Sequence, residues 1–222
     1  MSKICLKVKA VIFDMDGVIT HTMPDHYKAW KAVLKEEGVN VTFHDIYSRE
    51  GQRGIHSVKE IFTKYGLPFS LKRAKNILRK KEEYFKKIVR RRFVRGARRF
   101  LRRLYHEGFS LGLVTGTSRH ELHRILPKSI YNLFSVIITG TDVKKGKPHP
   151  EPFLKAIKHL KVNPEDAVVI ENAPLGISSA KKAGLLCIAL ETSLAKEYLR
   201  EADYTFHSIG HLEKNIKLTL KK

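Results

Sequence analysis

The chain has 222 residues, with 43 Lys and Arg against 22 Asp and Glu, so its formal net charge is +21. A hydrophobic content of 42%, together with 14 glycines, excludes intrinsic disorder and low-complexity fibre. The length favours one domain with a substantial insertion. No apolar run approaches the roughly 18 to 20 residues that a membrane-spanning helix needs, and residues 1–13 lack a secretion signal. We therefore expect a soluble cytoplasmic protein with no membrane partner.

The two cysteines, Cys5 and Cys187, both lie in strand-like apolar runs. This usage favours buried thiols in a reducing compartment over a disulfide framework.

Short β-rich runs alternate with segments of helical period through most of the chain. Such alternation predicts an α/β fold with a parallel sheet covered by helices on both faces. The expected strands are residues 8–13, 110–114, 136–138, 167–170 and 185–190, and the expected helices are residues 97–106, 119–126, 151–159, 175–183 and 194–201.

Nearly a hundred residues between the first two expected strands contain no convincing strand. Helical patterns fill this stretch, so we predict an all-helical insertion over about residues 25–93, with linkers near 20–24 and 93–96. The predicted domains are therefore an α/β core of residues 1–22 and 96–222 and a helical domain of residues 23–95. Its expected helices are residues 24–37, 43–50, 55–65 and 70–89.

Residues 71–103 contain 16 Lys and Arg but only two acidic residues, Glu82 and Glu83. A basic helical face of this kind attracts phosphorylated ligands and can hold nucleic-acid backbones without sequence preference. The aromatic residues here recur at helical spacing, which is more typical of a core stripe than of a base-stacking platform. Nucleic acid is therefore a minor hypothesis for the partner.

The first expected strand ends in Asp14 and Asp16, followed directly by Gly17. Carboxylates two residues apart at a strand end point to the same side, and Gly17 lets the chain turn away. Ligands of open α/β sheets bind at the carboxyl ends of the strands. Two such close negative charges call for a cation, and Mg²⁺ suits oxygen ligands.

The second expected strand ends in Thr115, Gly116, Thr117 and Ser118, and a helix with capping-box spacing to Glu121 follows. Hydroxyl groups and free backbone N–H groups at a helix N-terminus form an anion site, suited to a phosphoryl group.

Two further polar segments follow later expected strands. Lys144, Lys145 and Lys147 stand before or beside prolines that stiffen the chain, and a held ammonium group there can neutralise a transferring phosphoryl group. The residues alone do not choose among the three lysines. Glu171 and Asn172 follow another strand as oxygen ligands, although Asn172 alone is also compatible with a helix cap.

Together, these four strand ends resemble the haloacid dehalogenase superfamily, over the whole chain. The resemblance implies a Rossmann-like parallel-sheet core with a small all-helical cap inserted after the first strand. It also implies that Asp14 is a nucleophile forming an aspartyl-phosphate and that Asp16 is the general acid and base. By the same resemblance, Thr115 would hydrogen-bond the phosphoryl group and Lys147, directly before proline, would bridge nucleophile and phosphate. The implied Mg²⁺ ligands are Asp14, the Asp16 carbonyl, Glu171 and Asn172.

One residue departs from the pattern, because subfamilies of this type often carry Glu-Asp where this chain has Glu171-Asn172. The site then has one fewer negative charge. We expect Mg²⁺ to bind through the amide oxygen, somewhat more weakly.

Residues 14–20 and 26–30 resemble the β-phosphoglucomutase-like branch, in which a C1-type cap closes over the site. A histidine at the position of His26 would contact the acid/base aspartate there and couple cap motion to proton transfer. We expect His26, Gly116 and Thr117 to contact substrate. The loop at 49–54 offers Arg53 or Arg49 for a second anionic group, or is simply an exposed turn.

The leading hypothesis is a Mg²⁺-dependent phosphatase acting on a small phosphorylated metabolite through Asp14. A sugar-phosphate mutase using the same residues is the alternative. A nucleic-acid-binding or regulatory protein on this scaffold is a third hypothesis, prompted by the charge. The sequence allows a monomer or a dimer.

Overall fold

The computed structural model describes residues 3–221, and its centre is a six-stranded sheet in the order β4-β3-β2-β5-β6-β7. Every strand pair in the sheet is parallel, which confirms the predicted class. The strands are β2 (Ala10–Phe13), β3 (Ser110–Val114), β4 (Val136–Ile138), β5 (Ala167–Glu171), β6 (Leu186–Leu190) and β7 (Tyr204–Phe206).

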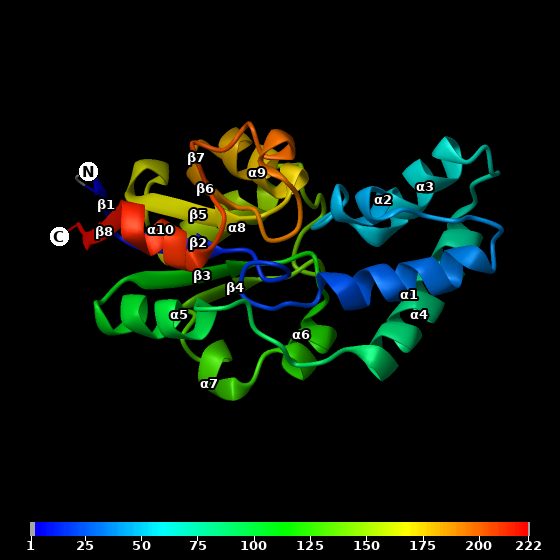
Figure 1. Cartoon of the computed structure of the whole chain (residues 1–222), viewed down its shortest axis with the longest axis horizontal. Helices are drawn as coiled ribbons and strands as arrows, with labels where there is room; N and C mark the ends of the chain where they lie inside the picture. Colours follow the sequence, from blue (N-terminus) through cyan, green and yellow to red (C-terminus); the bar gives the residue numbers. More distant parts are fainter. Residues whose placement is uncertain (1–2, 222) are drawn as a thin grey trace.

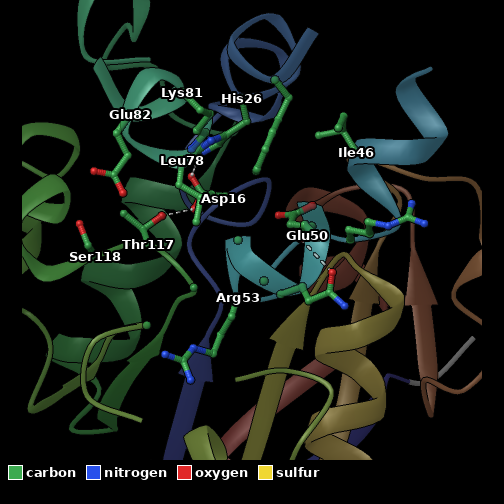
Figure 2. Close-up of a pocket in the computed structure, with 18 of the residues that line it drawn as sticks. Asp16, His26, Ile46, Glu50, Arg53, Leu78, Lys81, Glu82, Thr117 and Ser118 are labelled. Carbon is green, nitrogen blue, oxygen red and sulfur yellow. Dashed lines mark hydrogen bonds and ion pairs between the residues drawn. The ribbon is translucent and has the colours of Figure 1, made fainter. Parts of the chain in front are cut away.

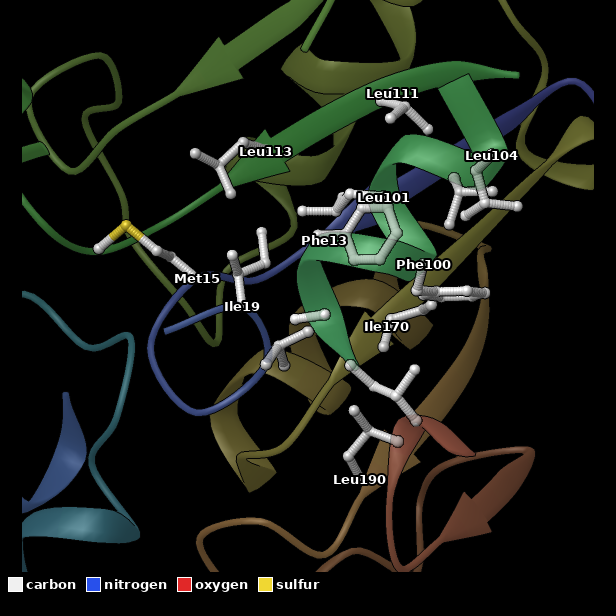
Figure 3. Close-up of a cluster of buried hydrophobic side chains, with 14 of the residues drawn as sticks. Phe13, Met15, Ile19, Phe100, Leu101, Leu104, Leu111, Leu113, Ile170 and Leu190 are labelled. Carbon is white, nitrogen blue, oxygen red and sulfur yellow. The ribbon is translucent and has the colours of Figure 1, made fainter. Parts of the chain in front are cut away.

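Helices cover both faces of this sheet because the central strands are apolar on both sides. In β2, Val11 and Phe13 belong to one hydrophobic cluster and Ala10 and Ile12 to another, as strand alternation requires. Figure 3 shows the first cluster, in which Phe13 packs against Phe100. The helices of the core are α5 (Ala97–His106), α6 (Arg119–Ile125), α7 (Lys128–Tyr131), α8 (Glu151–Leu160), α9 (Pro174–Lys182) and α10 (Ile209–Asn215).

The segment 23–95, called the cap from here on, holds four helices. Figure 1 shows them grouped beside the sheet at the end opposite to the two chain termini. They have their own hydrophobic cluster, which includes Trp30, Phe62 and Ile77. The cap helices are α1 (Met23–Lys35), α2 (Phe43–Tyr47), α3 (Gly54–Lys64) and α4 (Leu71–Ile88).

Helix α4 carries much of the basic segment yet buries one side. Ala74, Ile77, Lys81 and Phe85 are buried, and their spacings of three and four residues place them on one face of the helix. Most of the other charges face outward, Glu82 in the cavity lining excepted, so this helix is amphipathic, with a single lysine on its apolar face.

Several predictions about the chain ends were wrong. A second, parallel two-stranded sheet pairs β1 (Ile4–Val8) with β8 (Ile216–Leu220), and β7 and α10 were also missed. The expected helix over 194–201 is only a 3₁₀ turn at Lys196–Tyr198. Cys187 is buried as expected, but Cys5 is exposed on β1.

Among the described residues, none of the helices has the length and apolar character needed to cross a membrane.

Candidate active site

Asp14 lies at the carboxyl end of the central strand β2, directly after Phe13. Phe13 is in register with Leu113 of β3 and Ile170 of β5, and the backbone N–H of Asp14 donates to the Ile170 carbonyl at 3.0 Å. The tips of three neighbouring strands therefore meet at Asp14, which is 3% exposed.

The chain turns away from this position at Gly17. Its φ of +89° lies in the left-handed region, and a Cβ there would lie 2.2 Å from the amide nitrogen of Asn172. Only glycine meets both conditions, so Gly17 allows the first and last strand-end segments of the site to touch.

Lys147 connects two of the strand ends. Its Nζ lies 2.6 Å from Asp14 Oδ1 and 2.6 Å from Glu171 Oε1, and it donates to the Val114 carbonyl at 3.2 Å. Burial alone would lower the pKa of Lys147, but the two carboxylates raise it above its usual value. Lys147 is therefore a fixed buried cation beside Asp14.

The loop that carries Lys147 is held by Glu151 at the start of α8. The Glu151 carboxylate accepts the backbone N–H groups of Lys144 and Lys145, both at 2.9 Å. Lys144 and Lys145 are exposed. Of the three lysines among which the sequence did not choose, only Lys147 therefore reaches Asp14.

Asp16 is surrounded by hydrogen-bond donors from the cap and the core. It accepts from Thr22 and, at 3.0 Å, from Thr117, and His26 Nε2 lies 3.4 Å away. Burial alone would raise the pKa of Asp16, but His26 and these hydrogen bonds lower it to about 2. His26 is fixed by stacking on Phe85, with ring centroids 4.1 Å apart.

The loop after β3 lies next to the cap loop. Thr115 is buried and its hydroxyl accepts the backbone N–H of Thr117 at 3.1 Å. A Cβ on Gly116 would lie 3.0 Å from the backbone oxygen of Gly51. The cap is therefore closed onto the core at this point, with glycine on both sides of the contact.

Glu171 and Asn172 follow β5 and have different partners. Besides Lys147, Glu171 accepts the backbone N–H groups of Asn172 at 2.7 Å and Ala173 at 3.0 Å. The Asn172 side-chain amide donates to Glu50 Oε2 at 3.0 Å and to Ser193 at 2.8 Å. Both Glu171 oxygens are thus already engaged, whereas Asn172 keeps its Oδ1 free.

Among residues 3–221, the buried oxygen atoms without a hydrogen-bond partner include Asp14 Oδ2, Glu50 Oε1 and Asn172 Oδ1, as well as Glu121 Oε1 in the cavity lining. Buried carboxylate oxygens without partners are costly, and a hard divalent cation would satisfy them. Among residues 3–221, no three His, Cys, Asp or Glu side chains form a group suited to a metal ion, so such a cation also needs the Asn172 amide oxygen. The donor atoms fit Mg²⁺, which prefers oxygen ligands.

A cavity of about 280 Å³ lies between cap and core, beside Asp14 and Asp16. Figure 2 shows its polar lining, with Lys81 and Glu82 from α4, His26 from α1 and Glu50 from the cap loop. Burial lowers the pKa of Lys81, and this ammonium stands over Phe85 at 4.8 Å from the ring centroid. Apolar walls come from Met23, Trp30, Ile46, Ile61 and Leu78.

The two arginines of the cap loop differ in their contacts. Arg49 pairs with Glu60 at 3.0 Å and donates to the Asp45 carbonyl at 2.7 Å, so it holds α2 and α3 together. Arg53 lines the cavity and donates to the carbonyl of Lys144. Both are engaged in contacts within the protein.

Sequence reasoning gave no role to Glu50, Lys81 or Thr22, which the structure brings to the site. One signal was available for Lys81, because it stands on the apolar stripe of α4 where a hydrophobic residue is expected. Glu50 belongs to the loop at 49–54, which the sequence analysis considered only for its arginines. Its contact with Asn172 forms because the cap loop lies against the core.

Comparisons with known proteins agree with this architecture. The family described as haloacid dehalogenase-like hydrolase matches residues 11–190. A β-phosphoglucomutase from Bacillus subtilis is 33% identical over 82% of this chain and 83% of its own. A phosphorylated carbohydrates phosphatase from Thermotoga maritima is 32% identical over 80% of this chain and 82% of its own.

A solved structure of a β-phosphoglucomutase from Clostridium difficile superposes with a TM-score of 0.81 at 25% identity, covering 94% of this chain and 96% of the other.

The chain belongs to the haloacid dehalogenase-like hydrolase family. Membership confirms the expected family and fold, and with its phosphatase relatives it supports the expected enzyme class, a phosphomonoester hydrolase.

Proposed function

We propose that this protein is a Mg²⁺-dependent phosphatase that hydrolyses a small phosphorylated carbohydrate or a similar phosphomonoester. The observation that carries the proposal is the environment of Asp14. One of its oxygens pairs with the buried Lys147 and the other has no partner, beside the cavity between cap and core. A carboxylate fixed in this way is suited to nucleophilic attack on phosphorus.

In the first step, a carboxylate oxygen of Asp14 attacks the phosphorus atom. The bond from phosphorus to the carbohydrate oxygen breaks, that oxygen takes a proton from Asp16, and an aspartyl-phosphate remains. In the second step, water attacks the same phosphorus atom and gives its proton to Asp16. The bond to Asp14 then breaks and inorganic phosphate leaves.

Asp16 suits the second step as it stands, because its pKa of about 2 keeps it ionised at neutral pH before substrate binds. For the first step it needs a proton. Binding of a phosphate dianion beside it favours the protonated form, since a nearby negative charge raises the pKa of a carboxyl group.

Other residues hold the phosphoryl group and its surroundings. Lys147 neutralises charge on Asp14 and on the phosphoryl oxygens, and Thr115, Gly116 and Thr117 offer hydroxyl and backbone N–H groups. Glu171 positions Lys147, to which it is paired.

Asp14 Oδ2, the Asp16 carbonyl and Asn172 Oδ1 would hold Mg²⁺. The ion supplies Lewis-acid stabilisation of the charge that develops on the phosphoryl oxygens.

The cavity indicates a small substrate. Its volume of about 280 Å³ is at the low end for small-molecule sites, and the closed cap excludes bulk water from the reacting atoms. The relatives named as phosphorylated carbohydrates phosphatase and β-phosphoglucomutase support a carbohydrate as the group that carries the phosphate.

A sugar-phosphate mutase is the second candidate, supported by the β-phosphoglucomutase relatives. A mutase must hold a second phosphate on the cap side. Both cap-loop arginines are engaged elsewhere, and the Glu50 carboxylate faces the same space. These contacts favour hydrolysis over phosphate transfer between hydroxyl groups.

The test is phosphate release from a panel of sugar, polyol, nucleotide and glycolytic phosphates, with and without Mg²⁺, by wild type and Asp14→Asn. The proposal expects release that needs both the metal and Asp14. A mutase would instead turn over only when a sugar bisphosphate primes the reaction. Its product would be an isomeric sugar phosphate.

A further inference from the structure

We propose that Glu50 of the cap is itself a ligand of the Mg²⁺ ion, so that metal binding and cap closure are one coupled event. This inference rests on the Mg²⁺ site proposed above and adds a ligand that none of the four strand ends supplies.

Unpartnered buried oxygens of three residues surround the proposed Mg²⁺ site. Asp14, Glu50 and Asn172 are 3%, 8% and 0% exposed, and each has one buried oxygen without a hydrogen-bond partner. Two of these residues come from the core, and Glu50 comes from the cap loop that follows α2. A cation that satisfies the core pair therefore lies within reach of the third oxygen only while the cap is closed.

The charge of the core side chains also leaves room for an anionic ligand from the cap. Lys147 offsets one of the two carboxylates that it contacts, Asp14 and Glu171, and Asn172 contributes none. The core side chains that offer an oxygen to the ion, Asp14 and Asn172, therefore carry one negative charge for a doubly charged ion, because the Asp16 carboxylate is bound by Thr22 and Thr117. Glu50 adds a second anionic oxygen ligand, which Mg²⁺ prefers.

Asn172 and Glu50 are complementary as a hydrogen-bond donor and acceptor. The Asn172 amide donates to Glu50 Oε2 at 3.0 Å, which holds Glu50 in place and leaves its Oε1 free. An aspartate at position 172 would put a second carboxylate at that distance, and the two like charges would repel. The residue that departs from the family pattern is thus the one that lets the cap carboxylate approach.

Glu50 lies in the part of the cap loop that contacts the core. The next residue, Gly51, lies against Lys147 and Gly116, so closely that a Cβ on Gly51 would meet the Lys147 side chain at 2.7 Å. Opening the cap must withdraw Glu50 together with this loop. By linkage, a ligand that binds the closed form better shifts the equilibrium toward closure.

The experiment measures Mg²⁺ binding by calorimetry and, in parallel, amide hydrogen exchange of residues 49–54, using the full chain without substrate. The variants are Glu50→Gln, Asn172→Asp and the double variant. Glu83→Gln is the matched control, because Glu83 is an exposed cap carboxylate on α4.

We expect Glu50→Gln to raise the Kd for Mg²⁺ by at least about tenfold, the effect usual for a lost metal-site contact, and Glu83→Gln to leave it unchanged. Mg²⁺ should slow exchange of residues 49–54 in wild type but not in Glu50→Gln. The double variant, with its carboxylate moved to the core, should recover most of the affinity without protecting the loop.

Equal affinity and equal loop protection in wild type and Glu50→Gln would overturn the role of Glu50 while leaving the Mg²⁺ site standing. No Mg²⁺ binding by folded wild-type protein would overturn the Mg²⁺ site and this inference together. Melting curves without metal show whether each variant is folded, and the double variant tests the inference even where Asn172→Asp alone is destabilised.

Discussion

The ammonium nitrogen of Lys147 lies 2.6 Å from Asp14 Oδ1, although 133 residues separate the two in the chain. The same nitrogen lies 2.6 Å from Glu171. One cation therefore joins the proposed nucleophile to the strand end that precedes the proposed metal ligand Asn172, and its loss should affect both stability and chemistry.

Lys147→Met removes this cation, so the buried carboxylates of Asp14 and Glu171 lose their shared ion-pair partner. Breaking a buried ion pair from one side costs about 3–5 kcal/mol, and loss of charge stabilisation at phosphorus lowers kcat by at least about 100-fold. Urea unfolding and steady-state kinetics measure the two effects. Lys145→Met, at an exposed position of the same loop, serves as the control, and similar values for both variants would contradict the account.

His26→Gln tests the link between cap and acid/base residue. The neighbouring His26 helps to lower the pKa of Asp16 to about 2, so its removal should raise that pKa. Because the first step needs Asp16 in its protonated form, the fall of kcat/KM with rising pH is then expected to move to higher pH. A profile measured down to about pH 4 that stays unchanged would show that His26 does not set the protonation of Asp16.

Lys81→Met separates stability from substrate binding. Burial lowers the pKa of Lys81, which means that the folded protein disfavours this charge, so the variant should be as stable as wild type or more stable. Because Lys81 lines the cavity, we expect KM to rise by about tenfold, as for loss of one charged contact. Lys80→Met, on the outer side of α4, should change neither KM nor activity.

Asp45→Asn should destabilise the cap in a pH-dependent way. Burial alone would raise the pKa of Asp45, but Lys64 and the two hydrogen bonds from Thr42 lower it below its usual value. This carboxylate therefore stabilises the fold above the unfolded pKa of about 3.9, and the stabilisation is lost as the pH falls through the folded value.

We expect the variant to lose about 1–3 kcal/mol at pH 7 and the difference from wild type to shrink below about pH 3. Chemical unfolding at the two pH values measures this. A difference that stays constant between them would mean that the ionised form of Asp45 is not what stabilises the cap.

The sequence predicted the sheet and its strand-end residues because the signals were local. A strand buried on both faces is apolar throughout, as in β5, and acidic or hydroxyl residues directly after such strands lie at one edge by topology alone. Asp14, Asp16, Thr117, Lys147 and Asn172 accordingly lie together.

What the sequence did not predict depends on contacts between distant segments. The strands β1 and β8 pair only with each other, so neither has the doubly buried pattern of the main sheet. Glu50 meets Asn172 across 122 residues only because the cap is closed. Lys81 is one of many basic residues in 71–103, so composition alone did not single it out, although it is buried while Lys75, Arg79 and Lys87 are exposed.

The central claim is that Asp14 carries the phosphoryl group during turnover. The most direct measurement is acid quenching of wild-type protein during turnover of the best substrate from the panel, followed by borohydride reduction, which converts an aspartyl-phosphate to homoserine, and peptide mass spectrometry. The account predicts modification at Asp14, dependent on substrate and absent from Asp14→Asn. Full turnover with no trapped Asp14, or turnover retained by Asp14→Asn, would contradict it.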